Sequence, residues 1–324
     1  MMETNNGFER AHQIVQSLRT EINKVLIGQE SVVDHVLIAL LANGHVLIEG
    51  VPGLGKTLLV RALAKCFHGG FSRVQFTPDL MPSDITGHAM YNMANQQFQV
   101  RKGPVFTNLL LADEINRAPA KTQAALLEVM QERHVTIEGK PFETGKPFMV
   151  LATQNPVEQE GTYPLPEAEL DRFLMKIFID YPGEQSEKQM VKEITSGKSN
   201  ESFSLGDVKS IIEPKDLLAI QQLTANITVD DQVIDYTVRI VRATRDWVGI
   251  AMGAGPRGSL AITRAAKAYA LLHGRDFITP DDVKGVTTPV LRHRLLLSAD
   301  MEIEGITQDQ ILNEILQQVD APRI

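Results

Sequence analysis

An eight-residue run at positions 50–57 constrains the fold of this chain more than any other feature. It fits the pattern G-x-x-x-x-G-K-[ST] at every fixed position, and its residues are Gly50, Val51, Pro52, Gly53, Leu54, Gly55, Lys56 and Thr57. An apolar stretch at 45–49 precedes it, and apolar residues at helical spacing follow it, beginning with Leu58. This order of strand, loop and helix predicts a site, including Leu58, where backbone amides and a helix N-terminus hold a polyphosphate.

A second motif supports this interpretation. Four apolar residues at 109–112 read as a buried strand that ends in Asp113 and Glu114. In such a site Lys56 reaches the β and γ phosphates, Thr57 and Asp113 hold Mg²⁺, and Glu114 orients the attacking water. A carboxylate pair at a strand end can instead cap the next helix, but the phosphate loop favours the catalytic interpretation. The cofactors expected are ATP and Mg²⁺, and Glu114 predicts hydrolysis as well as binding.

Composition narrows the class of protein. The 324 residues suffice for about two domains, and 43% apolar with 22% charged residues is typical of a globular protein. A net charge of −8 argues against a broad basic surface for nucleic acid. The start of the chain lacks the apolar core of a signal peptide, and no apolar run approaches the ~20 residues of a membrane span, so a cytoplasmic location is expected. The scattered histidines argue against a protein metal cage, and the single cysteine, Cys66, cannot form an internal disulfide.

The apolar runs predict an α/β fold with three layers. Strands are expected at 45–49, 71–76, 109–112, 148–152 and 174–179, and their continuous apolar character predicts a five-stranded parallel sheet covered on both faces. Polar and turn-rich residues at 77–103 indicate an insert, and 134–148 reads as a hairpin. Beyond Gly183 only helices are expected, at 184–195, 214–225, 230–247, 257–273 and 279–292. The predicted domains are therefore a P-loop core over 1–182 and an all-α lid over 183–324.

Longer strings give the chain a family resemblance. The sequence QFTPDLMPSDITG at 75–87, ADEINRAP at 112–119, ATQNP at 152–156, GTYPLPEA at 161–168 and LDRF at 170–173 together resemble the MoxR branch of the AAA+ ATPases. The resemblance covers about residues 27–294.

The resemblance implies roles for further residues. Asn155 matches the first sensor, which places the lytic water. Arg172 matches the finger that one subunit inserts into its neighbour's site, although an ion pair with Glu169 or Asp171 is the alternative. Arg257 matches a second sensor that reaches the γ-phosphate of its own chain, but Gly255 stands where the family usually has serine before Pro-Arg.

Weaker matches concern the base and the restraint of the catalytic acid. Gly28 and Gln29 resemble the turn that packs near the adenine. Either Gln75 or Thr77 is expected to restrain Glu114 until a partner binds, and the sequence does not choose between them.

The resemblance also implies partners. It indicates a homo-oligomeric ring of six, a protein client, and a partner with a von Willebrand factor A domain, in chaperone-like remodelling, maturation or cofactor insertion. Tyr91 and Phe98 in the insert are either client contacts or anchors of their own loop. A magnesium or cobalt chelatase subunit and a DNA-dependent motor are the alternatives, the second disfavoured by the acidic balance.

Overall fold

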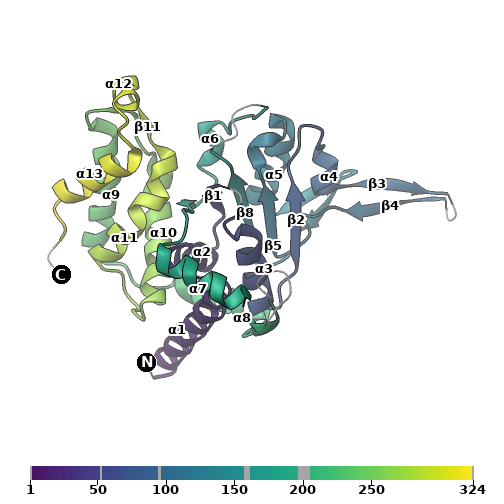
Figure 1. Ribbon diagram of the computed structural model, residues 1–324, viewed down its shortest axis with the longest axis horizontal. Coiled ribbons are helices and arrows are strands. Elements are labelled where there is room, and N and C mark those ends of the chain that lie inside the picture. The colour runs from purple at the N-terminus through teal and green to yellow at the C-terminus, as the bar shows by residue number, and fades with distance from the viewer. Residues whose placement is uncertain (1, 52, 94–95, 157–160, 196–204, 323–324) are drawn as a thin grey trace.

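The computed structural model describes residues 2–51, 53–93, 96–156, 161–195 and 205–322. At its centre is a five-stranded parallel sheet with the strand order β2-β5-β8-β1-β9 (Figure 1). The strands are β1 (Val46–Glu49), β2 (Phe71–Gln75), β5 (Leu109–Asp113), β8 (Met149–Gln154) and β9 (Met175–Phe178). The predicted parallel sheet is therefore confirmed, with each strand within a residue or two of its expected bounds.

Helices cover both faces of this sheet, as its apolar strands require. One face carries α1 (Met2–Asn23), α2 (Glu30–Leu41) and α3 (Lys56–Cys66), and the other carries α5 (Ala120–Glu132). Alternate residues of β1 show the division, because Val46 and Ile48 pack with the first group whereas Leu47 packs with α5. The core thus has the three layers that the sequence predicts.

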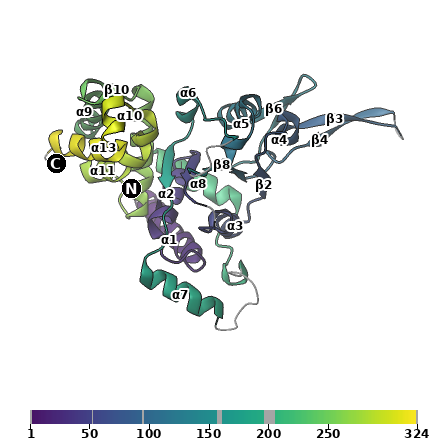
Figure 2. The same ribbon diagram turned by 45° about the horizontal axis from the view of Figure 1, so that its top comes forward.

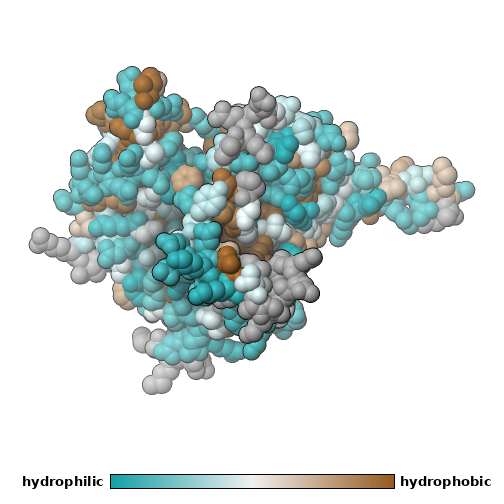
Figure 3. All heavy atoms as spheres, in the orientation of Figure 1, coloured by the Kyte–Doolittle hydropathy of each residue, from teal (hydrophilic) through white to brown (hydrophobic). Residues whose placement is uncertain are grey.

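Two segments leave the layered core where inserts are predicted. They are α4 (Pro82–Thr86) with the β3 (Gly87–Asn92) and β4 (Gln97–Lys102) hairpin, and the hairpin of β6 (His134–Ile137) and β7 (Lys140–Glu143). The β3–β4 hairpin projects far from the rest of the molecule (Figure 1), and all six residues of β4 are exposed. Tyr91 and Phe98 contact each other edge to face across the strands at 5.3 Å, yet Phe98 remains 73% exposed. Pale brown, apolar atoms therefore lie among the hydrophilic atoms of this projection (Figure 3).

The C-terminal part is mainly helical. Its helices are α7 (Glu184–Thr195), α8 (Pro214–Ala225), α9 (Asp231–Asp246), α10 (Pro256–Leu272), α11 (Pro280–Leu291), α12 (Ala299–Ile303) and α13 (Gln308–Gln318). Helices α9 to α13 form a lid beside the sheet (Figures 1 and 2). The expectation that no strand follows residue 183 is wrong in one detail, because β10 (Ile250–Met252) pairs with β11 (Leu296–Leu297). Strands of two or three residues are too short to show an alternating pattern in the sequence.

Helix α8 lies between the core helix α2 and the lid helix α10 and contacts both. Gln221 Nε2 donates to Leu40 O of α2 at 2.6 Å, and the Ile211 amide before α8 donates to Cys66 O at the end of α3 at 2.7 Å. Residues 205–225 therefore attach the C-terminal part to the helical layer of the core. Across the described residues, none of the helices combines the length and apolar composition that a bilayer span requires.

Candidate active site

The glycine-rich run at 50–57 joins β1 to α3. Gly53 and Gly55 have φ angles of +89° and +79°, which disfavour any side chain, and a Cβ on either would meet nothing within 4 Å. At Gly50 a Cβ would instead lie 2.5 Å from Ile179 O of the neighbouring chain segment. The loop thus needs glycine for backbone shape at two positions and for close packing at a third. Pro52 lies outside the described residues.

Lys56 is the first residue of α3, and its side chain bends back over the loop. Its Nζ donates to Gly50 O at 2.5 Å. Burial lowers the pKa of Lys56, while the nearby carboxylates of Asp113, Glu114 and Glu49 act in the opposite direction and favour the charged form. The ammonium therefore lies between an open loop of amides and a group of acids, where a bound polyphosphate would meet it.

The remaining residues of the run border the same opening. Val51 and Leu54 are partly buried beside the glycines, and Thr57 and Leu58 lie in the first turn of α3. The hydroxyl of Thr57 and the carboxylate of Asp113 are oxygen donors, and Mg²⁺ prefers one or two such protein ligands together with phosphate oxygens and water. The donor set next to this loop therefore fits a magnesium ion bound jointly with a nucleotide.

One buried hydroxyl fixes both acids at the end of β5. Thr153 Oγ1 in β8 donates to Asp113 Oδ1 at 2.7 Å and accepts the Glu114 backbone N–H at 2.9 Å. Glu114 has a left-handed backbone, with φ 56° and ψ 52°, which is uncommon outside glycine. Because Thr153 is fully buried, it holds this backbone conformation and the orientation of Asp113 at once.

Two side chains of β2 contact the same acids. Arg73 Nη2 donates to Asp113 Oδ2 at 2.6 Å, and Gln75 Nε2 donates to Glu114 Oε2 at 2.6 Å. Thr77 instead donates to the carboxylate two residues further along the chain. Of the two residues expected to restrain Glu114, the structure therefore brings Gln75 into contact with it.

Asn155, Gly28 and Gln29 lie around the same edge of the sheet. Asn155 directly follows β8 and is only 8% exposed. Gly28 has a φ of +76°, and a Cβ there would lie 2.5 Å from Ser186 Cβ in α7. Gln29 Nε2 donates to Asp180 O at 2.8 Å. The predicted adenine-side turn thus packs where β9 leads into α7.

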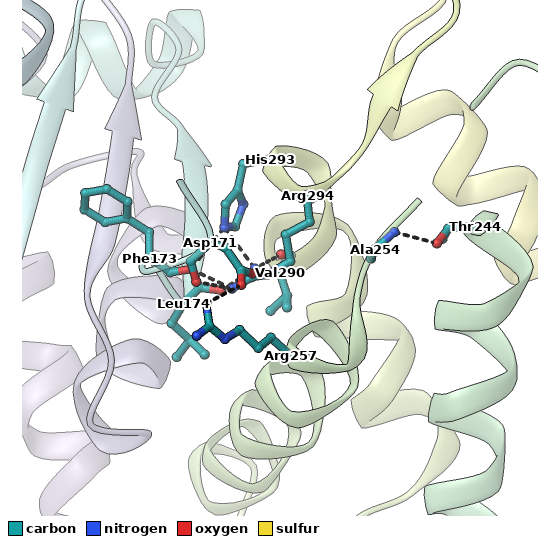
Figure 4. A network of polar contacts seen from close by, with 9 residues as sticks. All are labelled: Asp171, Phe173, Leu174, Thr244, Ala254, Arg257, Val290, His293 and Arg294. Carbon is teal, nitrogen blue, oxygen red and sulfur yellow. Dashed lines mark hydrogen bonds and ion pairs between the residues drawn. The ribbon is translucent and has the colours of Figure 1, made fainter. Parts of the chain in front are cut away.

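Arg172 and Arg257 lie at the opposite edge of the sheet. Arg172 Nη1 donates to Gln131 Oε1 at 2.6 Å near the C-terminal end of α5. Arg257 Nη1 lies 3.3 Å from Asp171 Oδ2 (Figure 4). Both line a cavity of about 370 Å³ together with residues 43–45, which precede β1. The phosphate loop follows β1, and the four residues of that strand separate the two edges by about 13 Å.

This placement differs from two sequence expectations. Arg257 does not lie beside the phosphate loop of its own chain, because α10 begins at the edge from which β1 enters the sheet. In the described chain the carboxylate of Asp171 forms ion pairs with Arg257 and Arg294, so the alternative in which it pairs with Arg172 is not what the structure shows. Arg172 and Arg257 share one surface, on the far side from the acids.

Sequence reasoning missed four residues that hold the site. Arg73 and Thr153 contact the acids, and Asp171 and Arg294 contact the segment that carries Arg172. A polar residue in an apolar strand was a signal for Thr153, and alternation along β2 places Arg73 on the side of Gln75. Arg294 had no local signal, because it lies 123 positions from its partner Asp171.

Two family models match the chain. Residues 45–175 match the model described as "ATPase family associated with various cellular activities (AAA)", and residues 242–315 match the AAA lid domain. The two matches fall on the sheet-bearing core and on the helices that stand beside it.

Curated relatives and a solved structure match almost the whole chain. Chaperone MoxR1 of Mycobacterium tuberculosis is 46% identical over 94% of this chain and 81% of its own length. YeaC of Bacillus subtilis is 44% identical over 97% of both chains, and MoxR of Methylorubrum extorquens is 31% identical over 93% of both. The crystal structure of an ATPase candidate from Cytophaga hutchinsonii superposes with a TM-score of 0.91 and 41% identity, over 99% of both chains.

Proposed function

The chain belongs to the MoxR family of AAA+ ATPases, and from this premise we propose that it couples ATP hydrolysis to chaperone-like remodelling of a protein client. One observation carries the catalytic part of the proposal: the buried Thr153 hydroxyl holds Asp113 and Glu114 next to the half-buried ammonium of Lys56. The name of the Mycobacterium tuberculosis relative, Chaperone MoxR1, supports the chaperone part.

In the proposed reaction the loop amides and Lys56 bind the β and γ phosphates of ATP. Thr57 and Asp113 would hold Mg²⁺, which when bound neutralises charge on the phosphate oxygens. Glu114 orients a water molecule and accepts its proton as the water oxygen bonds to the γ-phosphorus, while the bond from that phosphorus to the β–γ bridging oxygen breaks and ADP leaves with phosphate as the other product. Asn155, at the end of the adjacent strand, positions the same water.

The base is proposed to lie over the turn formed by Gly28 and Gln29. This turn packs against the start of α7, so the occupied site would contact the segment that joins core and lid. The division into a nucleotide core over 1–182 and a lid over 183–324 is part of the same proposal.

Gln75 is proposed to restrain Glu114 in the free chain. Its amide donates to the Glu114 carboxylate, which Arg117 Nη1 also contacts at 3.0 Å. Because two donors hold the Glu114 carboxylate, it cannot rotate freely toward the attacking water. Since only six residues separate Gln75 from α4, which leads directly into the projecting hairpin, a client that pulls on the insert would act on this contact.

A neighbouring chain is proposed to complete each site. The acids and the phosphate loop lie at one edge of the sheet, and Arg172 lies at the other, so one copy cannot bring them together. Arg257 shares the Arg172 surface, and we therefore assign it to the neighbour's nucleotide as well, in place of the own-chain role expected from the sequence. A head-to-tail ring of six follows from the family resemblance.

The client, a von Willebrand factor A domain partner and a cytoplasmic location remain predictions from the sequence. A chelatase subunit and a DNA-dependent motor are less well supported. Three relatives that match the chain over 90% or more of its length are named MoxR1 or MoxR.

The proposal is tested with Glu114→Gln and Lys56→Ala. Glu114→Gln should bind ATP but hydrolyse it about 10²–10⁴-fold more slowly, since a general base is removed. Lys56→Ala should lose ATP binding in calorimetry. Unchanged turnover in Glu114→Gln would show that Glu114 is not the base.

The same variant tests the client. Glu114→Gln should retain its client in the presence of ATP, so the proteins that co-purify with it are identified by mass spectrometry, with Lys56→Ala as the control. Recovery of a large tetrapyrrole-binding subunit would favour the chelatase alternative. Hydrolysis by the unmodified protein that is stimulated by DNA and lost at raised salt would favour the motor.

A further inference from the structure

A buried arginine of the lid, Arg294, forms hydrogen bonds to the chain on both sides of Arg172. Arg294 follows α11 in a short 3-10 helix (Arg292–Arg294), and its side chain is only 4% exposed. Its Nε donates to Asp171 Oδ1 at 2.7 Å and its Nη2 donates to Phe173 O at 2.7 Å (Figure 4). Further contacts reach Asp171 O and Leu174 O, both at 3.3 Å.

These contacts leave little freedom for the residue between them. Asp171 and Phe173 are the two chain neighbours of Arg172, and the guanidinium bonds to both. A planar guanidinium offers five donors in a fixed fork, so it can hold several carbonyl oxygens in one geometry. His293 lies beside it with its ring nitrogen 3.0 Å from Phe173 O, and burial lowers the pKa of His293 well below its ordinary range, so this neighbour stays neutral.

Asp171 links this grip to the second arginine of the same surface. One of its carboxylate oxygens accepts from Arg294 and the other lies against Arg257 at the start of α10. The lid therefore reaches the Arg172 segment from two of its elements. Arg172 itself is anchored to the core through α5, by Gln131 and Leu127 O.

We propose that Arg294 is a positioning residue for Arg172: through its grip on Asp171 and Phe173, the orientation of the lid sets where the finger stands relative to the neighbour's nucleotide. This inference rests on the proposed shared site. It makes the lid of one chain a control element for hydrolysis in the adjoining chain, without any contact between Arg294 and nucleotide.

The test assigns Arg294 to a complementation group. Arg294→Lys keeps the charge but cannot hold both sides of the segment, so its turnover should fall about 10–100-fold, the cost of a small misplacement. Its affinity for a fluorescent ADP analogue should not change, because the loop lies at the other edge of the sheet. Mixed with Lys56→Ala chains, which supply a normal finger, it should regain turnover. Mixed with Arg172→Ala chains it should not.

Arg292→Lys is the matched control. Arg292 belongs to the same 3-10 helix and also joins lid to core, but it contacts Asp309 Oδ2 at 2.7 Å and Lys176 O at 3.2 Å, away from the finger. It should keep most of its turnover. If Arg294→Lys does not unfold cooperatively or does not assemble, Asp171→Asn serves as the second variant, because Asp171 is partly exposed. We expect the same turnover and the same mixing results from it as from Arg294→Lys.

Each outcome separates the inference from the proposed function. Recovery in the Arg294→Lys and Arg172→Ala mixture, or normal turnover of Arg294→Lys alone, would overturn the positioning role. Failure of the Arg172→Ala and Lys56→Ala mixture would instead reject the shared site. The double variant Arg172→Ala with Arg294→Lys needs no mixing and tests whether Arg294 acts through Arg172: a rate equal to that of Arg172→Ala supports the positioning role, and a lower rate contradicts it.

Discussion

His45 and Thr153 are buried polar residues whose hydrogen bonds define their chemical state. The Val150 N–H donates to His45 Nδ1 at 2.9 Å, so the ring proton is on Nε2, which donates to Met130 O at 3.1 Å. Burial lowers the pKa of His45 to about 4. The folded protein therefore keeps this ring neutral at pH values where the unfolded chain protonates it.

The first prediction concerns acid sensitivity. A histidine with a folded pKa of about 4 and an unfolded pKa of about 6.5 contributes stability above pH 6.5 that is lost as the pH falls toward 4. Between pH 7 and pH 5 this loss is on the order of 2 kcal/mol. Urea unfolding at both pH values should show a smaller loss in His45→Gln than in the unmodified protein. An equal loss in both would contradict the assignment.

The second prediction concerns the hydroxyl of Thr153. Thr153→Val leaves the partly buried Glu114 N–H without its acceptor, at a cost of about 1–3 kcal/mol in unfolding free energy. Because both acids lose their common support, turnover should fall about 10²-fold while nucleotide affinity without magnesium persists. Thr237→Val, at an equally buried threonine that bonds within α9, is the control and should retain turnover. Normal hydrolysis by Thr153→Val would show that the acids hold themselves in place.

Individual helices and strands differ in how far local sequence determines them. Helices α7 and α8 occupy the predicted residues 184–195 and 214–225, because acidic first turns and a proline at the start of α8 mark their ends. The predictions missed β10 and β11, which are too short to show a pattern, and α13, although a capping box of Thr307 and Gln310 marks its start. The phosphate loop was predictable as a contiguous motif, whereas the contacts of Arg294 join residues distant in sequence.

The third prediction concerns the β3–β4 hairpin. Ala89 pairs with Val100, so replacing 89–100 by Asn-Gly would join the paired residues His88 and Arg101 through a two-residue turn. As the removed strands are largely exposed, the melting temperature and ATP affinity should change little. Client retention by the Glu114→Gln form should be lost. A large drop in melting temperature would show that the hairpin supports the core.

At the scale of the whole molecule, the two halves of the proposed site lie on opposite edges of one sheet. Short motifs identified the candidate residues of both halves, and strand direction places them, because Arg172 precedes β9 whereas the loop follows β1. The position of Arg257 depends instead on how the lid packs against the core, which no local motif specifies, and its place beside Arg172 favours the neighbour's site over the own-chain role. Strand direction fixed the positions of Asp113, Glu114 and Asn155, since the carboxyl ends of parallel strands meet at one edge.

The fourth prediction tests the revised role of Arg257. Arg257→Ala chains mixed with Lys56→Ala chains should regain hydrolysis, because one supplies a nucleotide site and the other supplies intact arginines. Mixed with Arg172→Ala chains they should stay inactive. If Arg257 served its own chain, that second mixture would recover, since the Arg172→Ala chain would keep a complete site and receive a finger. Steady-state phosphate release from both mixtures decides between the two roles.

In the proposed shared site, the separation of loop and arginines across the sheet gives an assembly of these chains a direction. An open row of chains has a nucleotide site without a neighbour's arginine at one end and an arginine without a site at the other. Only a closed ring pairs every site with an arginine. Each chain then depends on a single neighbour and serves the other one. A chain with a mutated arginine would inactivate the nucleotide site of one neighbour only. In a mixed ring, each such chain would therefore stop hydrolysis in the chain on the same side.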